Sequence, residues 1–501
     1  MKQKTIKNII DKQKNENIVL TSEKFKPLKY GDLKKLVNKI ARQLSSHGIS
    51  NKDRAAIVLP NGPHMATSFL AISSFMSAAP LNPAYKTEEY EFYLNDLKPK
   101  IVLVEPNSSN KVLEAAKKLS IPVCELKIKN NSLTGEFDLF EDERDYNSPN
   151  ENDEALVLHT SGTTSRPKIV PLTNKNVFSS SSNISNTLNL SENDHTLNIM
   201  PLFHIHGLIA VLLSSIESGG SVFASSGFNA LKFLDLAKSE KITWYSGVPT
   251  MHQAILLRAE RNKDLPKQLN LRFIRSSSAS LPVAVFEKLN DIFSCPVIEA
   301  YGMTEATHQM SSNPLPPKQQ KPGFVGMPAG PKICIMNNKN EILKNGETGE
   351  ICIKGENVTS GYENNQEANK INFVDGWFKT GDEGYFDEDG YLKISGRLKE
   401  IINKGGEKIS PLEIDDVLMY HPSVEQAVCF GFKDKMLGED IAAAIVFKKG
   451  KACSELEIKH YAEEKLAKFK IPKKIFFVNE IPKGSTGKLQ RIGLAKKFGM
   501  E

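Results

Sequence analysis

The feature that most constrains the fold is the alternation of short apolar, β-branched runs with amphipathic stretches. Residues 55–59 and 101–105 have the pattern of strands, whereas residues 30–47 and 64–76 have the period of helices. Such alternation predicts an α/β fold with largely parallel sheets. The same rhythm predicts five further strands, at residues 197–201, 221–224, 243–246, 273–276 and 297–299.

The length of the chain and a change in its sequence pattern predict more than one domain. The chain has 501 residues, and a single hydrophobic core stops growing at about 250–300 residues. After residue 331 the sequence turns to short strands separated by Gly, Asp and Asn turns, which indicates a β-rich subdomain. A further break follows residue 396. We therefore expect a large N-terminal domain at residues 1–396 and a small α+β C-terminal domain at residues 397–501.

Composition disfavours several classes of protein. The net charge of +6 comes from 65 basic and 59 acidic residues that are scattered along the chain, so nucleic-acid binding is not expected. The six cysteines lie far apart, form no C-x-x-C pair and are interpreted as buried thiols in a reducing compartment. The most apolar stretch, residues 65–81, contains several serines and Pro80, which predicts a buried helix and no membrane span.

The two ends of the chain predict a cytoplasmic protein. Residues 1–17 are rich in Lys and Asn and lack the apolar core of a signal peptide. Residues 497–501 do not form a Ser-Lys-Leu type peroxisomal address.

The strongest local motif is residues 158–168, which directly follow an apolar run. Several hydroxyls, a glycine and a lysine on one turn can wrap the phosphates of a nucleotide through backbone N–H groups, hydroxyl donors and one positive charge. No Walker P-loop occurs in the chain, and an exposed Ser/Thr linker is the structural alternative. The candidate phosphate-binding residues are Thr160, Ser161, Gly162, Thr163, Thr164 and Lys168.

A second motif occupies residues 299–306, at the end of a predicted strand. An aromatic ring there can cover an adenine, a hydroxyl can reach phosphates, and Glu305 is a candidate ligand for phosphate-bound Mg²⁺. A turn in the core is the alternative. The candidate ATP-binding residues are Glu299, Ala300, Tyr301, Gly302, Thr304 and Glu305.

Three further residues complete the candidate nucleotide site. Asp382 and Arg397 are candidates for binding the ribose, because a carboxylate accepts hydrogen bonds from both ribose hydroxyls. Lys488 lies on a glycine-containing loop near the C-terminus. Taken singly, a Thr-Gly-Asp triplet is usually a turn and a lone lysine is usually a solvated charge. The argument for all three depends on the complete set of motifs.

These five motifs, in this order, resemble the acyl-adenylate-forming superfamily of acyl- and aryl-CoA synthetases, firefly luciferase and peptide-synthetase adenylation domains. The resemblance implies two α/β subdomains and a β-barrel-like one, followed by a mobile C-terminal domain. It implies that the loop from Thr160 to Lys168 holds phosphates, that Tyr301 stacks on adenine, and that Thr304 and Glu305 serve phosphate and Mg²⁺. Asp382 and Arg397 would hold the ribose, and Lys488 would bridge the acyl carboxylate and the α-phosphate.

The sequence departs from the common superfamily pattern at Ser165 and Ile169, where glycine is usual. The Ser165 departure is shared with the oxalate–CoA ligase group, which several other segments also resemble: residues 164–168, 201–207, 275–280 and 304–314. His206, Ser278 and His308 within them would line a polar acid site, whereas a fatty or aryl pocket is mainly apolar. The alternative is that these histidines are structural.

The resemblance implies two half-reactions with ATP, Mg²⁺ and coenzyme A. The acid is first activated as its acyl-adenylate, and the acyl group then passes to coenzyme A after the C-terminal domain rotates about Lys399. Gly405 and Gly406 would permit close approach of the pantetheine arm, with Lys408 lining its channel.

Three rival functions remain open at this stage. A medium-chain or aryl acid–CoA ligase would share the ATP site. An enzyme that loads a carrier protein would need that partner in trans, because little sequence follows Lys488. A non-catalytic nucleotide sensor is disfavoured by the presence of both Glu305 and Lys488.

Overall fold

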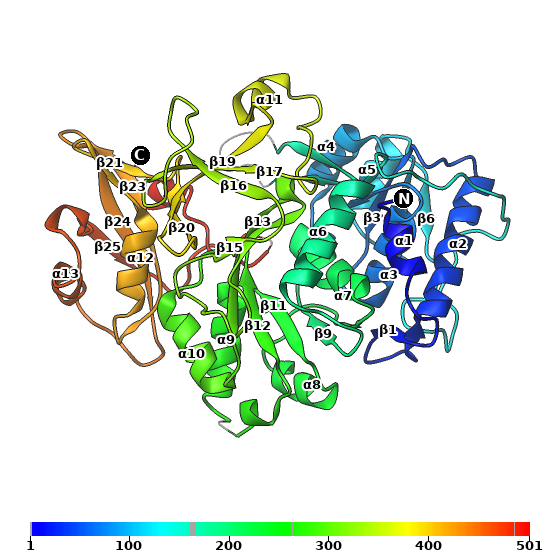
Figure 1. The fold of residues 1–501 in the computed structure, drawn as a ribbon, viewed down its shortest axis with the longest axis horizontal. Coiled ribbons are helices and arrows are strands. Elements are labelled where there is room, and N and C mark those ends of the chain that lie inside the picture. The colour runs from blue at the N-terminus through cyan, green and yellow to red at the C-terminus, as the bar shows by residue number, and fades with distance from the viewer. Residues whose placement is uncertain (1–2, 161–166, 263, 485, 501) are drawn as a thin grey trace.

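The computed structural model describes residues 3–160, 167–262, 264–484 and 486–500. Four sheets are arranged along the molecule, with the first α/β unit at one end and the C-terminal unit at the other (Figure 1).

The first α/β unit is a six-stranded sheet in the order β6-β5-β3-β4-β7-β8. Its strands are parallel except for the antiparallel pair β7 and β8, whose connection carries the predicted phosphate-binding loop. The strands are β3 (Arg54–Val58), β4 (Ser77–Pro80), β5 (Ile101–Val104), β6 (Val123–Glu125), β7 (Glu154–His159) and β8 (Ile169–Thr173). The helices that connect them are α3 (Pro63–Ser73), α4 (Thr87–Leu97) and α5 (Val112–Lys118).

The second α/β unit is a nine-stranded sheet in the order β15-β14-β13-β12-β11-β9-β10-β1-β2. Its strands are β1 (Ile18–Thr21), β2 (Leu28–Lys29), β9 (His195–Asn198), β10 (Ser221–Ala224), β11 (Trp244–Gly247), β12 (Phe273–Ser277), β13 (Val297–Met303), β14 (His308–Ser312) and β15 (Met327–Pro328). The strands from β1 through β13 in this order pair in parallel, whereas β2, β14 and β15 pair antiparallel. Its helical segments are α1 (Ile6–Asp11), α2 (Tyr30–Ser46), α6 (Asn174–Thr187), the π-helix η1 (His206–Leu213), α7 (Ser214–Glu217), α8 (Phe233–Ser239), α9 (Pro249–Ala259), η2 (Pro266–Gln268), α10 (Val283–Phe293) and η3 (Thr304–Ala306).

The third unit is the predicted β-rich subdomain, a five-stranded antiparallel sheet. It consists of β16 (Lys332–Met336), β17 (Gly349–Lys354), β18 (Phe373–Val374), β19 (Trp377–Phe386) and β20 (Leu392–Arg397), with the helix α11 (Gln366–Asn372).

The C-terminal unit has its own five-stranded sheet. Its strands are β21 (Ile402–Lys404), β22 (Glu407–Ile409), β23 (Val424–Asp434), β24 (Gly438–Phe447) and β25 (Lys474–Phe477). Its helices are α12 (Pro411–Met419), α13 (Glu455–Glu463), η4 (Lys468–Lys470) and α14 (Leu494–Lys497). Two clusters of buried apolar side chains lie entirely within residues 402–500, separate from the core of the α/β units.

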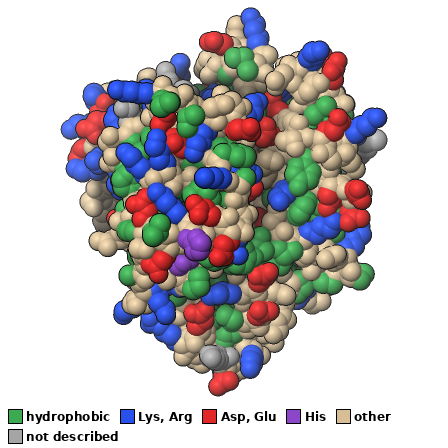
Figure 2. Space-filling view, turned by 90° about the vertical axis from the view of Figure 1, so that its left-hand side faces the viewer, with side chains coloured by type: hydrophobic (Ala, Val, Ile, Leu, Met, Phe, Trp, Pro, Cys, Tyr) green, Lys and Arg blue, Asp and Glu red, His purple; other side chains and the backbone are tan. Residues whose placement is uncertain are grey.

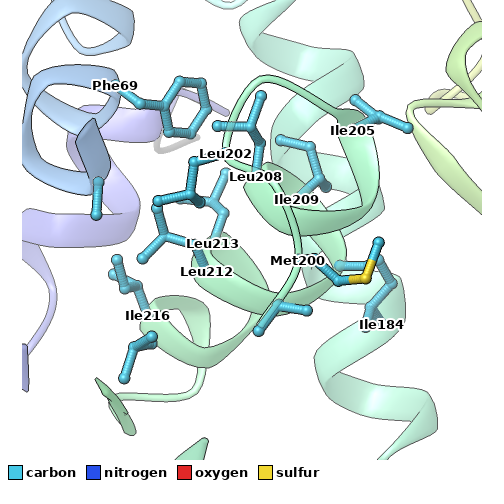
Figure 3. Close-up of a cluster of buried hydrophobic side chains, with 14 of the residues drawn as sticks. Phe69, Ile184, Met200, Leu202, Ile205, Leu208, Ile209, Leu212, Leu213 and Ile216 are labelled. Carbon is cyan, nitrogen blue, oxygen red and sulfur yellow. The ribbon is translucent and has the colours of Figure 1, made fainter. Parts of the chain in front are cut away.

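The two α/β units share one hydrophobic core (Figure 3). Phe69 of α3, from the first unit, lies in the same buried cluster as Leu208 and Leu212 of η1, from the second. Every residue of η1 is buried, so burial of its apolar side chains stabilises the π-helix against its less favourable hydrogen-bond geometry. Because η1 begins at His206, this packing holds that histidine in place.

Three predicted elements require correction. The stretch at residues 65–81 is not one helix, because α3 ends at Ser73 and Ser77–Pro80 forms β4. Ala78 and Ala79 lie on β4, which pairs with β3 on one side and with β7 on the other, a placement that the helical period did not reveal. The predicted strand at 197–201 lies earlier, as β9, and β13 continues to Met303 because β14 pairs with it.

The surface of the C-terminal side mixes both signs of charge. Figure 2 shows Lys and Arg side chains interspersed with Asp and Glu across this face, so it offers no single basic footprint for nucleic acid. Among the residues that the structure describes, no helix combines the length and apolar character needed to cross a membrane.

Candidate active site

Two of the predicted site residues, and one that was not predicted, lie where neighbouring parallel strands end. Ser246 lies near the end of β11, Ser278 follows β12, and Thr304 follows β13. The carboxyl edge of a parallel sheet is the usual place for ligands in such folds. The topology therefore brings residues that are far apart in the sequence to one edge.

The base of the predicted phosphate-binding loop is closed by two hydrogen bonds. The Thr160 N–H donates to the Lys168 carbonyl at 2.9 Å, and the Lys168 N–H donates to Thr160 Oγ1 at 3.3 Å. Both residues thus stand at the mouth of the loop. Ser161, Gly162, Thr163 and Thr164 lie outside the described residues.

Lys168, Tyr362 and Glu305 form a cluster beside this loop. The Lys168 Nζ lies 4.3 Å from the centroid of the Tyr362 ring, and the Tyr362 hydroxyl donates to Glu305 Oε1 at 2.7 Å. Burial raises the pKa of Glu305, while the Tyr362 hydroxyl and the Lys168 charge act in the opposite direction. Burial also lowers the pKa of Lys168. The cluster thus holds a carboxylate and an ammonium whose charges are poorly solvated and favour a charged ligand.

Thr304 opens η3 and is half-buried next to a small cavity. The cavity has a volume of about 50 Å³ and is lined by Pro80, Leu81, Asn82, Tyr85, Tyr93, Leu158, His159, Phe203, His204 and Thr304. Its walls come from both α/β units, so the Thr304 hydroxyl lies where these two units meet.

Tyr301, Asp382 and Arg397 form a connected group. The Tyr301 hydroxyl donates to Asp382 Oδ2, and the Arg397 Nε lies 3.2 Å from Asp382 Oδ1. Burial raises the pKa of Asp382, with the charge of Arg397 opposing it, and Asp382 is only 4% exposed. The register pairs Asp382 of β19 directly with Arg397 of β20. The two predicted ribose residues are therefore cross-strand neighbours beside the predicted adenine residue.

Glu299, Ala300 and Gly302 lie within β13 and have contacts that account for them structurally. Glu299 Oε1 accepts from the Leu281 N–H at 2.9 Å, and burial raises the pKa of Glu299 to about 8. The Ala300 carbonyl accepts from Ser277 Oγ at 2.8 Å. A Cβ on Gly302 would lie 2.1 Å from the His308 carbonyl oxygen, so the close approach of β14 requires glycine there. Contact of these three residues with ATP stays a prediction.

Lys488 belongs to the C-terminal unit but faces the N-terminal site. Next to it, the Gly487 carbonyl accepts from Thr250 Oγ1 of α9 at 2.8 Å. Burial and the charge of Arg397 lower the pKa of Lys488 to about 8, and Asp382 opposes this. The Lys488 charge also contributes to lowering the pKa values of His206 and His308. Lys488 therefore stands between the predicted nucleotide and acid residues.

His206, Ser278 and His308 lie together, as the acid-site prediction requires. His206 Nδ1 is 2.9 Å from Ser278 Oγ, and the ring centroids of His206 and His308 are 4.9 Å apart. Burial lowers the pKa of both histidines well below the usual range, so both are neutral at pH 7. Among the described residues, neither ring nitrogen of His308 has a hydrogen-bond partner. A buried imidazole in this state has a donor available for a small polar ligand.

Two of these acid-site residues have a strained backbone. Ser278 has φ of 76° and His308 has φ of 95°, in the left-handed region that favours glycine. Strain of this kind costs about 1–3 kcal/mol per residue and is concentrated at functional sites. The two side chains are therefore held in place by the surrounding structure at a cost in stability.

The predicted coenzyme A residues are not joined to the clusters above. Gly405 and Gly406 form the turn between β21 and β22, with φ of 60° and 94°, and Lys408 lies on β22. The Gly405 N–H donates to the Leu437 carbonyl at 2.8 Å. Figure 1 shows β21 at the outer edge of the C-terminal unit. Contact with the site would require this unit to move.

The predicted hinge Lys399 lies in a turn between the third and fourth sheets. The Leu398 N–H donates to the Gly381 carbonyl at 3.0 Å, and the Glu400 N–H donates to the Arg397 carbonyl at 2.8 Å. On the far side, Glu400 pairs with Arg491 of the C-terminal unit at 3.1 Å. Lys399 therefore separates a residue bonded to the third sheet from one bonded to the C-terminal unit.

Sequence reasoning gave no role to Tyr362, Arg275 or Ser246, although Arg275 begins one of the segments that resemble the oxalate–CoA ligase group. Tyr362 follows a loop with no motif, and nothing in the sequence relates it to Glu305. Arg275 carried a signal, because a charged residue in the middle of a predicted buried strand is rare unless it is paired. Ser246 lies on β11 directly opposite Arg275, a pairing that only the register reveals.

Comparison with known proteins gives matches over nearly the whole chain. A profile described as AMP-binding enzyme matches residues 8–363, and one described as AMP-binding enzyme C-terminal domain matches residues 413–488. The chain is 45% identical over 505 residues to an oxalate–CoA ligase of Arabidopsis thaliana, covering 98% of each chain. It is 42% identical over 479 residues to an oxalate–CoA ligase of Saccharomyces cerevisiae, covering 90% of this chain and 88% of that one.

Among solved structures, the chain resembles MatB from Rhodopseudomonas palustris at 27% identity, with 99% of each chain covered. The TM-score is 0.91 against the ATP-bound form and 0.81 against the apo form of that enzyme. The arrangement of the units is thus more similar to the ATP-bound form.

Proposed function

Because the chain belongs to the AMP-binding enzyme family, we propose that it is an ATP-dependent acid–CoA ligase whose acid is oxalate. The observation that carries the choice of acid is the group of polar side chains His206, Ser278 and His308 at the strand ends. The similarity to oxalate–CoA ligases at 42–45% identity supports the same choice. ATP and coenzyme A are substrates of this reaction.

In the first half-reaction, one carboxylate oxygen of the acid bonds to the α-phosphorus of ATP. The bond from that phosphorus to the bridging oxygen breaks, and pyrophosphate leaves. Two anions must approach each other, so catalysis depends on positive charge located where negative charge develops. Lys168 faces the phosphates, and Lys488 lies between the α-phosphate and the acid. Tyr301, Asp382 and Arg397 hold the adenosine.

Mg²⁺ is proposed as the metal that accompanies ATP. Glu305 fits this ion, because Mg²⁺ is usually bound by one or two carboxylates together with substrate phosphates. Among the described residues, no group of three or more His, Cys, Asp or Glu could hold a metal without such phosphates. When bound, the ion would offset phosphate charge. The Tyr362 hydroxyl donates to Glu305 Oε1, and the Lys168 ammonium lies over the same Tyr362 ring, so Tyr362 links the proposed metal ligand to Lys168.

In the second half-reaction, the coenzyme A sulfur bonds to the acyl carbonyl carbon and the bond from that carbon to the AMP oxygen breaks. AMP leaves with the electron pair, and the thiol proton passes to solvent. Lys488 has no role in this step. We propose that the C-terminal unit, at residues 397–501, rotates about Lys399. Lys488 then withdraws, and the turn at Gly405 and Gly406, with Lys408, comes to line the thiol channel.

The hinge predicts unequal effects on the two half-reactions. Lys399 is the third residue of the turn closed by the bond from the Glu400 N–H to the Arg397 carbonyl, and proline there fixes φ near about −65° and disfavours a helical conformation at the residue before it. Lys399→Pro is therefore expected to change the ratio of adenylation to thiolation rates by at least about tenfold. Pyrophosphate exchange measures the first rate, and coenzyme A consumption with a supplied acyl-adenylate measures the second.

Lys399→Ala is the matched control for this test. It removes the same side chain but leaves the backbone free, so both rates should stay near those of the wild type. If Lys399→Pro also keeps both rates, rotation about this residue is wrong for this protein.

Two rival activities are separated by substrate. A medium-chain or aryl acid–CoA ligase would need an apolar acid site, whereas neutral imidazoles and a serine hydroxyl are found here. An enzyme that loads a carrier protein would form the adenylate but would not consume free coenzyme A. We also propose a cytoplasmic location, which the six free cysteines support.

The test of the proposed function is a ligation screen. Oxalate, malonate, short fatty acids and coumarate-like acids are supplied with ATP, Mg²⁺ and coenzyme A, and AMP release is measured. Oxalate is expected to have the highest kcat/KM. A medium-chain fatty acid is supplied as well, and if it or a coumarate-like acid exceeds oxalate, the proposed acid is wrong, although the ligase assignment stands.

A further inference from the structure

Arg275 is a buried cation whose charge no carboxylate in the described structure balances. Its side chain is 0% exposed, and it donates to Ser246 Oγ at 3.3 Å and to Gln309 Oε1 at 3.2 Å. Its Nε has no hydrogen-bond partner among the described residues. Burial lowers the pKa of Arg275 to about 9, so it remains charged at neutral pH. A buried charge of this kind is costly unless something compensates it.

The two side chains that contact Arg275, those of Gln309 and Ser246, each turn an oxygen toward its guanidinium and accept a hydrogen bond from it. Gln309 Nε2 donates to Thr187 Oγ1 at 3.2 Å and to the Ala329 carbonyl at 3.0 Å, which directs its Oε1 toward Arg275. Ser246 lies directly across from Arg275 in the pairing of β11 with β12. The guanidinium is therefore fixed in the sheet and is oriented toward the acid site through Ser246.

A chain of hydrogen bonds leads from Arg275 to Ser278. A guanidinium can only donate, so Ser246 Oγ accepts a hydrogen bond from Arg275. The hydroxyl proton of Ser246 is then free to be donated to His206 Nε2, which lies 2.6 Å away. His206 is neutral, so its single proton then lies on Nδ1, which donates to Ser278 Oγ at 2.9 Å. The Ser278 hydroxyl proton remains for a ligand. Every donor in the chain is directed toward the acid site.

The charge of Arg275 also reaches the second histidine. It contributes to lowering the pKa values of both His206 and His308, after the larger effect of burial. The site thus combines two neutral donors, the Ser278 hydroxyl and the His308 imidazole, with the fixed positive charge of Arg275 behind them. A dianion bound to these donors would supply the missing counter-charge, whereas a monoanion bound only through its reacting carboxylate would not.

We propose that Arg275 and Ser246 are positioning residues that select a dicarboxylate over a monocarboxylate: they fix the His206 tautomer, present the Ser278 hydroxyl as a donor, and hold a positive charge behind it. This inference rests on the proposed function, because it assigns the second carboxylate of the acid to that same site. Neither residue needs to touch the substrate.

The test compares oxalate with oxamate, in which a carboxamide replaces one carboxylate. The two acids have nearly the same shape but differ by one negative charge. The kcat/KM of each is measured by pyrophosphate exchange, which needs no coenzyme A. Arg275→Gln removes the charge but keeps a side chain that can donate to Ser246. It is expected to lower the ratio of kcat/KM for oxalate to that for oxamate by about tenfold or more, mainly through KM for oxalate.

Three further variants separate the effect of the Arg275 charge from the effect of the hydrogen-bond relay, which is the chain from Arg275 through Ser246 and His206 to Ser278, and from the effect of packing. Arg275→Lys keeps the charge and should keep most of the preference for oxalate. Ser246→Ala keeps the charge but interrupts the relay, and should lower the ratio by about threefold or more, since the His206 tautomer is then free. Ser276→Ala removes a buried hydroxyl on the same strand, outside the relay, and should leave the ratio unchanged.

Some results would overturn the proposal. Equal losses on oxalate and oxamate in Arg275→Gln would give Arg275 a structural role alone, and so would an Arg275→Lys variant that loses the preference. If Arg275→Gln does not fold, an unchanged ratio in Ser246→Ala rejects the relay. The wild-type protein tests the proposed function separately: failure to use oxalate refutes that function, whereas the variants test the selection of charge.

Discussion

Replacing Lys488 with alanine is expected to slow adenylation by about 10²–10³-fold, while thiolation of a supplied acyl-adenylate continues near the wild-type rate. The reason is that, in the proposed mechanism, Lys488 acts on charge that develops only as the acid attacks the α-phosphate. Its position between the acid residues and Arg397, in the arrangement that resembles an ATP-bound relative, matches this role. Pyrophosphate exchange measures the first step, and coenzyme A consumption measures the second.

The control for this variant is Lys483→Ala. Lys483 is an exposed lysine on the same loop, and its main chain bridges to Leu489, so the substitution removes an equal charge without reaching the site. Both half-reactions should keep wild-type rates. Equal losses of adenylation and thiolation in Lys488→Ala would refute the assignment of Lys488 to the first step.

The pH dependence gives a second measurement on the same residue. Burial, with the charge of Arg397, lowers the pKa of Lys488 to about 8 in the protein without ligands. Only the protonated form attracts the anions, so kcat/KM for adenylation should fall as the pH rises through about 8. Lys488→Arg should move this decline to higher pH, because a guanidinium stays protonated. Persistence of the same decline in Lys488→Ala would assign it to another group.

Family membership and the mixed α/β fold were predictable from the sequence, and the matching profiles and structures confirm them. The strands that the sequence predicted well, such as β3 and β10, are continuous apolar runs, because both faces of a parallel sheet are covered. The pairing of β1 with β10 was not predictable, since it joins Leu20 to Val222 across a long separation. Local patterns carry no information about such contacts.

The π-helix η1 shows a different limit. Its sequence from His206 onward is uniformly apolar, so its period is uninformative, and only packing against Phe69 and the rest of the shared core stabilises this conformation. The left-handed backbone at Ser278 and His308 could not be predicted from the sequence either. A positive φ is expected at glycine, and neither residue is glycine. These conformations depend on tertiary contacts.

Only those residues of the candidate site that belong to a sequence motif were predictable. The motifs identified Asp382 and Arg397, and the structure pairs them. They gave no role to Tyr362 or Arg275, because Tyr362 lies on a loop without a motif and Arg275 contacts Ser246 on a neighbouring strand. Residues that hold other residues leave no fixed spacing in a sequence, so the supporting contacts of this site required coordinates.

Replacing Ser278 or His308 with alanine is expected to raise KM for oxalate by about 10–150-fold, since each change removes a donor to a charged group, worth about 1.5–3 kcal/mol. Oxalate is a dianion at neutral pH, and the carboxylate that is not activated must be met by donors in a site that partly excludes water. ATP binding should stay nearly intact, because neither residue belongs to the nucleotide clusters. Alanine adds no backbone strain at φ of 76° or 95°, because both native residues already carry a Cβ there.

The double variant makes the test sharper. If Ser278 and His308 each contact the same carboxylate, their effects should not add, because residues that share one partner are coupled. KM for oxalate and Kd for ATP are measured for both single variants and the double variant, with Ser276→Ala as the control for loss of a buried hydroxyl. A KM for oxalate that stays within about twofold of the wild type in both single variants would locate the second carboxylate elsewhere, because even one lost donor to a charge exceeds that change.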